Sequence, residues 1–193
     1  MLLQRLRERT APLHARLEAV ADLMSPTLSR ARYGALLKRF YGYYQPLERL
    51  LSKWTDWSGL DLQLERRRKL PAMLTDFAAL GVEAMEIDAI ALCPSLPGVD
   101  SLEDALGCLY VFEGATLGGQ VISRHLQARF GMDARTGSAF FGSYGPEVGP
   151  MWKRFVAALT SYPATAPQGE RIIQAACRSF QSFGAWLESG ETR

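Results

Sequence analysis

The sequence predicts an all-α fold, in which a single-domain helical bundle spans residues 1–193. Apolar residues recur at three- and four-residue spacing in most segments, as on the buried face of a helix. No segment has the alternating pattern of a half-buried strand, and neither an internal repeat nor a second domain is evident. With 48% hydrophobic and 22% charged residues, the chain can bury a substantial core.

The first two expected helices contain prolines within their apolar patterns. Apolar residues outline the first helix as far as Val20, and we expect it to start or break near Pro12, with Thr10 as its N-cap. The second helix starts near Ser29. We expect a kink at Pro46, because proline removes a backbone donor and clashes with the preceding turn.

The middle of the chain is expected to hold a short helix at residues 70–80, a loop at 93–100 and then one long helix. Ser101 is the expected N-cap of the long helix, and Asp104 completes a pattern similar to a capping box. Gly131 is a suitable C-terminal stop. The glycines inside this helix predict a bend.

The last third of the chain is expected to form a loop and two helices. A glycine-rich stretch at residues 137–149 predicts the loop, and helices follow at about 150–159 and 168–187. The last helix carries a stripe of apolar residues: Ile172, Ala176, Phe180, Phe183 and Leu187.

Composition and charge exclude several classes of function. A net charge of +2 provides no bulk basicity for nucleic acid. The three cysteines are far apart and odd in number, so neither a disulfide framework nor a zinc site is indicated, and we expect a cytoplasmic protein. We expect no secretory signal. The longest nearly apolar stretch, 106–122, is short for a membrane span and contains Glu113.

Residues 109–126, LYVFEGATLGGQVISRHL, place Gly114, Gly118 and Gly119 in the middle of the long helix. Each glycine inside a helix costs about 1 kcal/mol relative to alanine. Close helix packing, a GxxxG membrane dimer and the close approach of a flat ligand each explain bare backbone at this point. The membrane dimer is the least favoured, since the apolar stretch is short, and the pattern leaves the other two explanations open.

The chain has two histidines, His14 and His125, which argues against a multi-histidine metal site. A haem iron, by contrast, needs only one protein ligand. Glu18 lies one helical turn after His14 and can orient its imidazole for ligation, although an exposed pair on a surface helix has the same spacing. We interpret His125 as structural or as a residue at the edge of such a site.

Four motifs, taken together and in order, resemble the haem oxygenase family, especially the bacterial branch that accompanies bacteriophytochromes. The motifs are LHARLE at 13–18, FYGYYQPLE at 40–48, LYVFEGATLGGQ at 109–120 and FQSFGAWL at 180–187. The resemblance covers about residues 3–190. It implies a helical fold in which haem lies between a proximal helix and a distal helix kinked at glycines.

The resemblance also implies an activity and a set of site residues. Haem b is expected to be both prosthetic group and substrate, converted by O2 and an external electron donor to biliverdin, carbon monoxide and ferrous iron. His14 matches the proximal iron ligand, Tyr44 matches a tyrosine that holds distal water, and the three glycines match the distal helix. The other implied haem-binding residues are Glu18 beside the ligand, Arg7 and Lys153 at the propionates, and Phe180 at the pocket wall.

The sequence departs from the family pattern at Ala115, where many members have an aspartate that organises distal water. A haem-binding or delivery protein without turnover is therefore an alternative. A thiaminase-like hydrolase is another, and it would need Cys108 as an activated nucleophile. For the oxygenase, the expected partners are a ferredoxin- or flavoprotein-type reductase and a bacteriophytochrome that receives biliverdin. We expect a monomer without nucleic acid or membrane partners.

Overall fold

The structure is a computed structural model that describes residues 1–54, 57 and 59–190, and this part of the chain is helical without a strand. The all-α prediction is therefore confirmed. The α-helices are α1 (Leu2–Ala21), α2 (Arg30–Ser52), α3 (Leu70–Ala79), α4 (Ala84–Asp88), α5 (Leu102–Phe130), α6 (Ala139–Gly142), α7 (Val148–Ser161) and α8 (Ala166–Glu188). Two 3-10 turns, η1 (Leu64–Arg67) and η2 (Gly145–Glu147), complete the elements.

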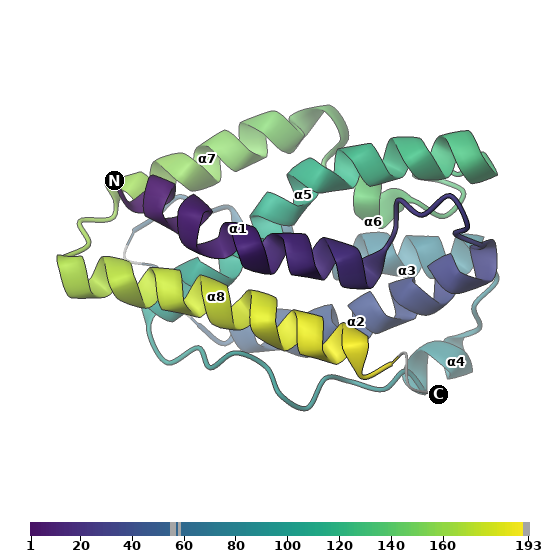
Figure 1. Cartoon of the computed structure of the whole chain (residues 1–193), viewed down its shortest axis with the longest axis horizontal. Coiled ribbons are helices and arrows are strands. Elements are labelled where there is room, and N and C mark those ends of the chain that lie inside the picture. Colours follow the sequence, from purple (N-terminus) through teal and green to yellow (C-terminus); the bar gives the residue numbers. More distant parts are fainter. Residues whose placement is uncertain (55–56, 58, 191–193) are drawn as a thin grey trace.

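Helix α5 runs through the middle of the bundle and changes direction about halfway along, as the sequence predicted (Figure 1). It packs most extensively against α8, which also packs along α1. At Gly107, an added Cβ would lie 2.5 Å from the carbonyl oxygen of Ile172, so the bare glycine lets α5 and α8 approach closely.

Ion pairs join α1 to α8, which run in the same direction (Figure 1). Arg5 pairs with Glu170 near the start of both helices, and Arg16 pairs with Glu188 at 2.9 Å near their ends. These side chains are substantially exposed, so the pairs contribute little stability by themselves. Apolar burial between the helices is the main stabilising term.

The expectation of an N-cap at Thr10 is wrong, because α1 continues from Leu2 through Pro12 to Ala21. The Thr10 hydroxyl donates to the carbonyl of Leu6 at 2.7 Å, one turn back, instead of capping a new helix. Pro12 leaves the carbonyl of Glu8 without a helical donor. Glu8 is exposed, so water can satisfy that carbonyl.

Helix α2 begins as expected, with the Ser29 hydroxyl accepting from the backbone N–H of Arg32. The helix continues through Pro46, whose missing N–H leaves the carbonyl of Gly42 free. The backbone N–H of Cys93 donates to that carbonyl at 2.8 Å. The carbonyl that Pro46 leaves free thus connects the predicted loop at 93–100 to α2 through a hydrogen bond.

The predicted start and end of α5 are confirmed. The Ser101 hydroxyl accepts from the N–H of Asp104, and Gly131 ends the helix with a φ of 69°. By length and composition α5 could cross a membrane, yet 61% of its most apolar window is buried inside the fold. The apolar residues of α5 therefore form part of the core of the bundle.

The expectation of a loop at 137–149 is wrong, because this stretch forms α6, η2 and the start of α7. Phe140 and Phe141 are both buried, and packing of these rings overrides the glycines around them. The Asp76 carboxylate accepts from the backbone N–H groups of Ala139 and Phe140, at 2.6 and 2.8 Å, and so caps α6. This cap comes from a distant part of the chain. Helix α4 was not expected from the sequence either.

Candidate functional site

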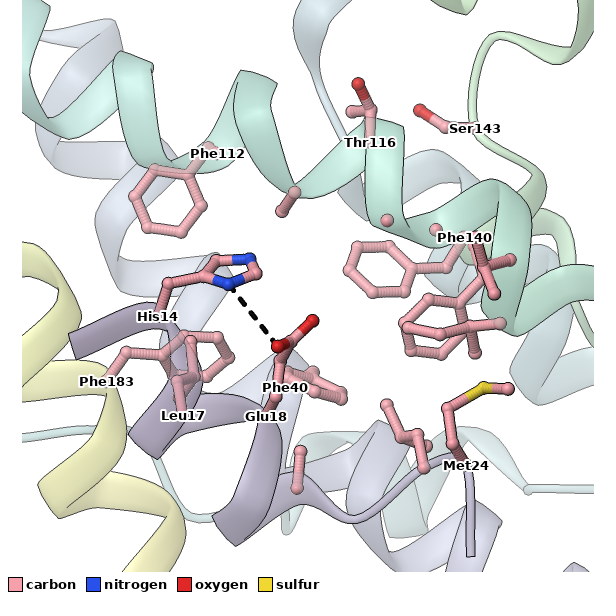
Figure 2. A pocket seen from close by; sticks show the side chains of 18 of the residues that line it. His14, Leu17, Glu18, Met24, Phe40, Phe112, Thr116, Phe140, Ser143 and Phe183 are labelled. Atoms are coloured by element: carbon pink, nitrogen blue, oxygen red, sulfur yellow. Dashed lines mark ion pairs between the residues drawn. The ribbon is translucent and has the colours of Figure 1, made fainter. Parts of the chain in front are cut away.

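A cavity of about 530 Å³ is bounded by α1 and α5, with α2, α6 and α8 completing its walls (Figure 2). This volume is typical of small-molecule and cofactor sites. The apolar part of the wall consists of Phe40, Phe112, Ile122, Phe140, Phe141 and Phe183. Such a wall suits a large, flat, mostly apolar ligand.

His14 points from α1 toward α5 and lines this cavity (Figure 2). Its Nδ1 lies 3.4 Å from Oε2 of Glu18, and both side chains are at least half exposed. The ring also contacts Phe180 edge-on, with centroids 5.7 Å apart. Because the carboxylate favours the proton on Nδ1, the lone pair of Nε2 is available to a metal ion in the cavity.

The three glycines of α5 that the sequence predicted as site residues have three different surroundings. Gly118 lines the cavity, and a Cβ added to it would meet no atom within 4 Å. A Cβ on Gly119 would lie 2.7 Å from the carbonyl oxygen of Phe141, so α6 requires glycine there. Gly114 is outside the cavity wall, with Trp152 3.9 Å from its added Cβ. Close helix packing therefore explains Gly119, whereas Gly118 borders open space in the cavity.

Tyr44 lines the cavity from α2 and is almost completely buried. Its ring packs edge-on against Phe112 and Phe140, with centroids 4.8 and 5.2 Å away. Burial, assisted by the nearby Glu48, raises the pKa of its hydroxyl well above the usual value. The hydroxyl is therefore neutral and able to donate a hydrogen bond.

The remaining predicted residues are not part of the cavity wall. Phe180 is buried and reaches the site only through its contact with the His14 ring. Arg7 and Lys153 are exposed, on α1 and α7, and neither is part of the cavity wall. His125 also lies outside the wall. Roles for Arg7 and Lys153 at the propionates stay predictions.

A buried charged cluster behind α5 was missed at the level of the sequence. Glu113 forms ion pairs with Arg67 and, at 3.1 Å, with Lys69, and it accepts a hydrogen bond of 2.8 Å from the Tyr144 hydroxyl. Lys69 also lines the cavity. The one residue that could have indicated this cluster from the sequence is Glu113, a carboxylate inside an apolar stretch. Arg67 and Lys69 belong to the run RRRK, whose composition is typical of a solvated surface.

Cys108 does not have the surroundings of a catalytic nucleophile. It is fully buried outside the cavity wall, and the Ser179 hydroxyl donates to its Sγ at 3.2 Å. Burial raises the pKa of the thiol to about 11, so the thiolate is scarce at neutral pH. The geometry therefore gives no support to a hydrolase that uses this cysteine.

The fold and the cavity define an α-helical protein with one histidine in the wall of a largely apolar cavity. A sequence profile of the family described as heme oxygenase matches residues 1–189, and the chain therefore belongs to the haem oxygenase family. Family membership makes haem the substrate and haem degradation the class of reaction.

Two relatives and one solved structure agree with this assignment. The chain is 29% identical to heme oxygenase PigA of Pseudomonas aeruginosa, covering 96% of this chain and 90% of the relative. It is also 29% identical to a heme oxygenase of Xanthomonas campestris, covering 80% and 88%. A crystal structure of NO- and CO-bound heme oxygenase from Neisseria meningitidis matches with a TM-score of 0.82 over 98% of this chain and 92% of that one. At 20% identity, the last match supports the fold alone.

Proposed function

We propose that this protein cleaves haem to biliverdin, carbon monoxide and ferrous iron, using O2 and electrons from an external donor. The observation that carries the proposal is that His14 on α1 and Gly118 on α5 line one apolar cavity. A single neutral histidine suffices to hold haem iron. The bare backbone at Gly118 leaves space on the α5 side of the ligand.

Each group of the cavity has a distinct task in this proposal. The Nε2 atom of His14 would hold the iron, and Glu18 would orient the ring through Nδ1. The aromatic wall would contact the porphyrin and exclude water from the cavity. Tyr44 offers a neutral hydroxyl for distal water. When bound, haem supplies the iron at which O2 is reduced.

The proposal extends to the protein's partners. A ferredoxin- or flavoprotein-type reductase would deliver the electrons, and biliverdin would pass to a bacteriophytochrome. The resemblance of the four motifs, taken together, to the phytochrome-associated branch supports this destination. The absence of a disulfide pattern supports a cytoplasmic location, and we propose a monomer.

Haem turnover by the purified protein tests the proposal directly. The protein is incubated with haemin, O2 and either ascorbate or ferredoxin with its reductase, and absorption spectra are followed. We expect the Soret band to decay while biliverdin absorption rises. A Soret band that persists, without biliverdin, would contradict the proposal.

Ala115 favours a second candidate function, a haem-binding or delivery protein without turnover. Ala115 lines the cavity and brings no carboxylate to it. The neighbouring Thr116 hydroxyl donates to the carbonyl of Glu113 at 2.6 Å and so is engaged within its own helix. A stable oxygen complex without ring opening in the same experiment would support this function instead.

A further inference from the structure

The cavity wall contains two charged side chains that the family resemblance did not predict, Asp22 and Lys69. Among the described residues, Glu18, Asp22 and Lys69 are the charged groups of the wall. The two carboxylates are exposed, whereas Lys69 is only 5% exposed. The ammonium group of Lys69 is thus the buried charge of the cavity.

Lys69 is held in place by contacts of its ammonium group and of its backbone. Its Nζ lies 3.1 Å from Oε1 of Glu113, donates to the Tyr144 hydroxyl, and is 4.0 Å from the centre of the Tyr144 ring. The backbone N–H of Lys69 donates to Glu48 on α2. With its head and its backbone both fixed, the side chain cannot turn out to solvent as surface lysines do.

The other oxygen of Glu113 is bound by Arg67, so one carboxylate is shared by two buried cations. Burying such charges costs several kcal/mol per ion, and replacing a buried ion pair with apolar residues is often neutral or stabilising. Stability alone is therefore a weak reason for Lys69 to be charged. A charge that borders a ligand cavity has an electrostatic effect on the ligand that an apolar side chain lacks.

We propose that Lys69 is a positioning residue of the distal pocket, where its ammonium orders water and favours negative charge on the α5 side of bound haem. It would supply the distal polarity that Ala115 does not. Glu113 and Tyr144 act through Lys69 by fixing its position. This inference rests on the proposed haem oxygenase function.

The acid–alkaline transition of the ferric haem complex reports on this charge through the absorption spectrum. The transition is a loss of a proton in the cavity, which a nearby cation favours. We expect Lys69→Met to raise the midpoint by about one pH unit, the effect of one charge several ångströms away. Glu113→Gln removes a negative charge and should lower it. Lys69→Arg keeps the charge and should stay near the wild-type midpoint.

Among the described residues, four charged or titratable groups face Lys69. These groups are Glu113 on α5, Tyr144 before η2, Glu48 on α2 and Arg67 at the end of η1. Opposite shifts from Lys69→Met and Glu113→Gln would identify the lysine charge as the cause. A purely structural cluster would destabilise both variants without moving their midpoints apart, and that result would overturn the proposal. If Lys69→Met does not fold, the sign of the Glu113→Gln shift decides.

Lys38→Met is the matched control, because Lys38 pairs with Glu86 at 2.8 Å and lies outside the cavity wall. It should change neither the midpoint nor the rate of haem consumption. The same samples are assayed for turnover, where Lys69→Met should be slower and Lys69→Arg should recover. If the wild type binds haem without consuming it, the proposed function fails, while the spectral shifts still test the lysine.

Discussion

The carbonyl oxygen of Phe141 lies 2.7 Å from the position that a Cβ on Gly119 would occupy. Helices α5 and α6 therefore touch backbone to backbone at this point. The adjacent Gly118 has no neighbour within 4 Å of its own Cβ position. Two consecutive glycines of one motif thus have different surroundings, a close helix contact at Gly119 and open cavity space at Gly118.

This difference predicts opposite effects of the same substitution on the ligand-free protein. Gly119→Ala should lower the free energy of unfolding by about 1–3 kcal/mol, because the backbone of α6 must shift. Gly118→Ala should raise it by up to about 1 kcal/mol, since alanine favours the helix and meets no atom. Urea unfolding of the two variants and the wild type measures both changes in unfolding free energy. Equal effects of the two substitutions would show that the contact with Phe141 does not limit residue 119.

His14→Ala should abolish the histidine-ligated spectrum of the ferric haem complex and stop turnover, because the cavity wall loses its metal-binding nitrogen. Added imidazole should fill the space and restore the spectrum. Glu18→Gln is the milder companion, expected to weaken haem binding by about tenfold through loss of ring orientation. An unchanged ferric spectrum in His14→Ala would reject this residue as the iron ligand.

Gly118→Leu should weaken haem binding by about tenfold or more, equivalent to at least about 1.4 kcal/mol, because the new side chain enters the cavity. Haemin titration followed at the Soret band measures the affinity. Gly34→Leu is the control, a helical glycine on α2 that also has open space at its Cβ but lies outside the cavity wall. Normal affinity in Gly118→Leu would mean that the ligand does not approach α5 at this residue.

Much of the helical architecture could be predicted because it depends on local signals. Apolar spacing gave the long helices, and the Ser101 cap and Gly131 stop located both ends of α5. The errors at Thr10 and at residues 137–149 share a cause. In both places the competing interactions are tertiary: α1 packs along α8, and the carboxylate of Asp76 caps α6 from a distant segment.

The candidate site was predictable only in part. The resemblance brought His14 and the glycines together, and the structure places His14, Gly118 and Gly119 around one cavity. No local rule could place Lys69 beside Glu113, because the contact joins segments far apart in the chain and the run RRRK has the composition of a surface. Side chains in a basic run become site residues only through the topology that buries them.

Asp76 predicts how stability depends on pH. Burial raises the pKa of its carboxyl to about 6 in the folded state, although two backbone N–H groups oppose the shift. Between about pH 4 and pH 6 the folded state therefore holds the proton while the unfolded chain releases it. The contribution of Asp76 to stability is thus greatest below the ordinary carboxyl pKa and is lost as pH rises through about 6.

Asp76→Asn should remove this decline, so that its unfolding free energy changes less between pH 4 and pH 7 than that of the wild type. The amide has one acceptor oxygen for the two N–H groups of α6, so the variant should be less stable at pH 4 by about 1–3 kcal/mol. The difference in unfolding free energy between the wild type and Asp76→Asn should become smaller toward pH 7. Asp133→Asn is the control variant. The N–H of Arg135 lowers the pKa of the Asp133 carboxyl, so the contribution of Asp133 to stability has the opposite trend with pH. Parallel pH profiles of unfolding free energy for wild type and Asp76→Asn would show that another group sets the pH dependence of stability.

Asp76→Asn should also weaken haem binding. The substitution weakens α6, and α6 carries Phe140 into the cavity wall.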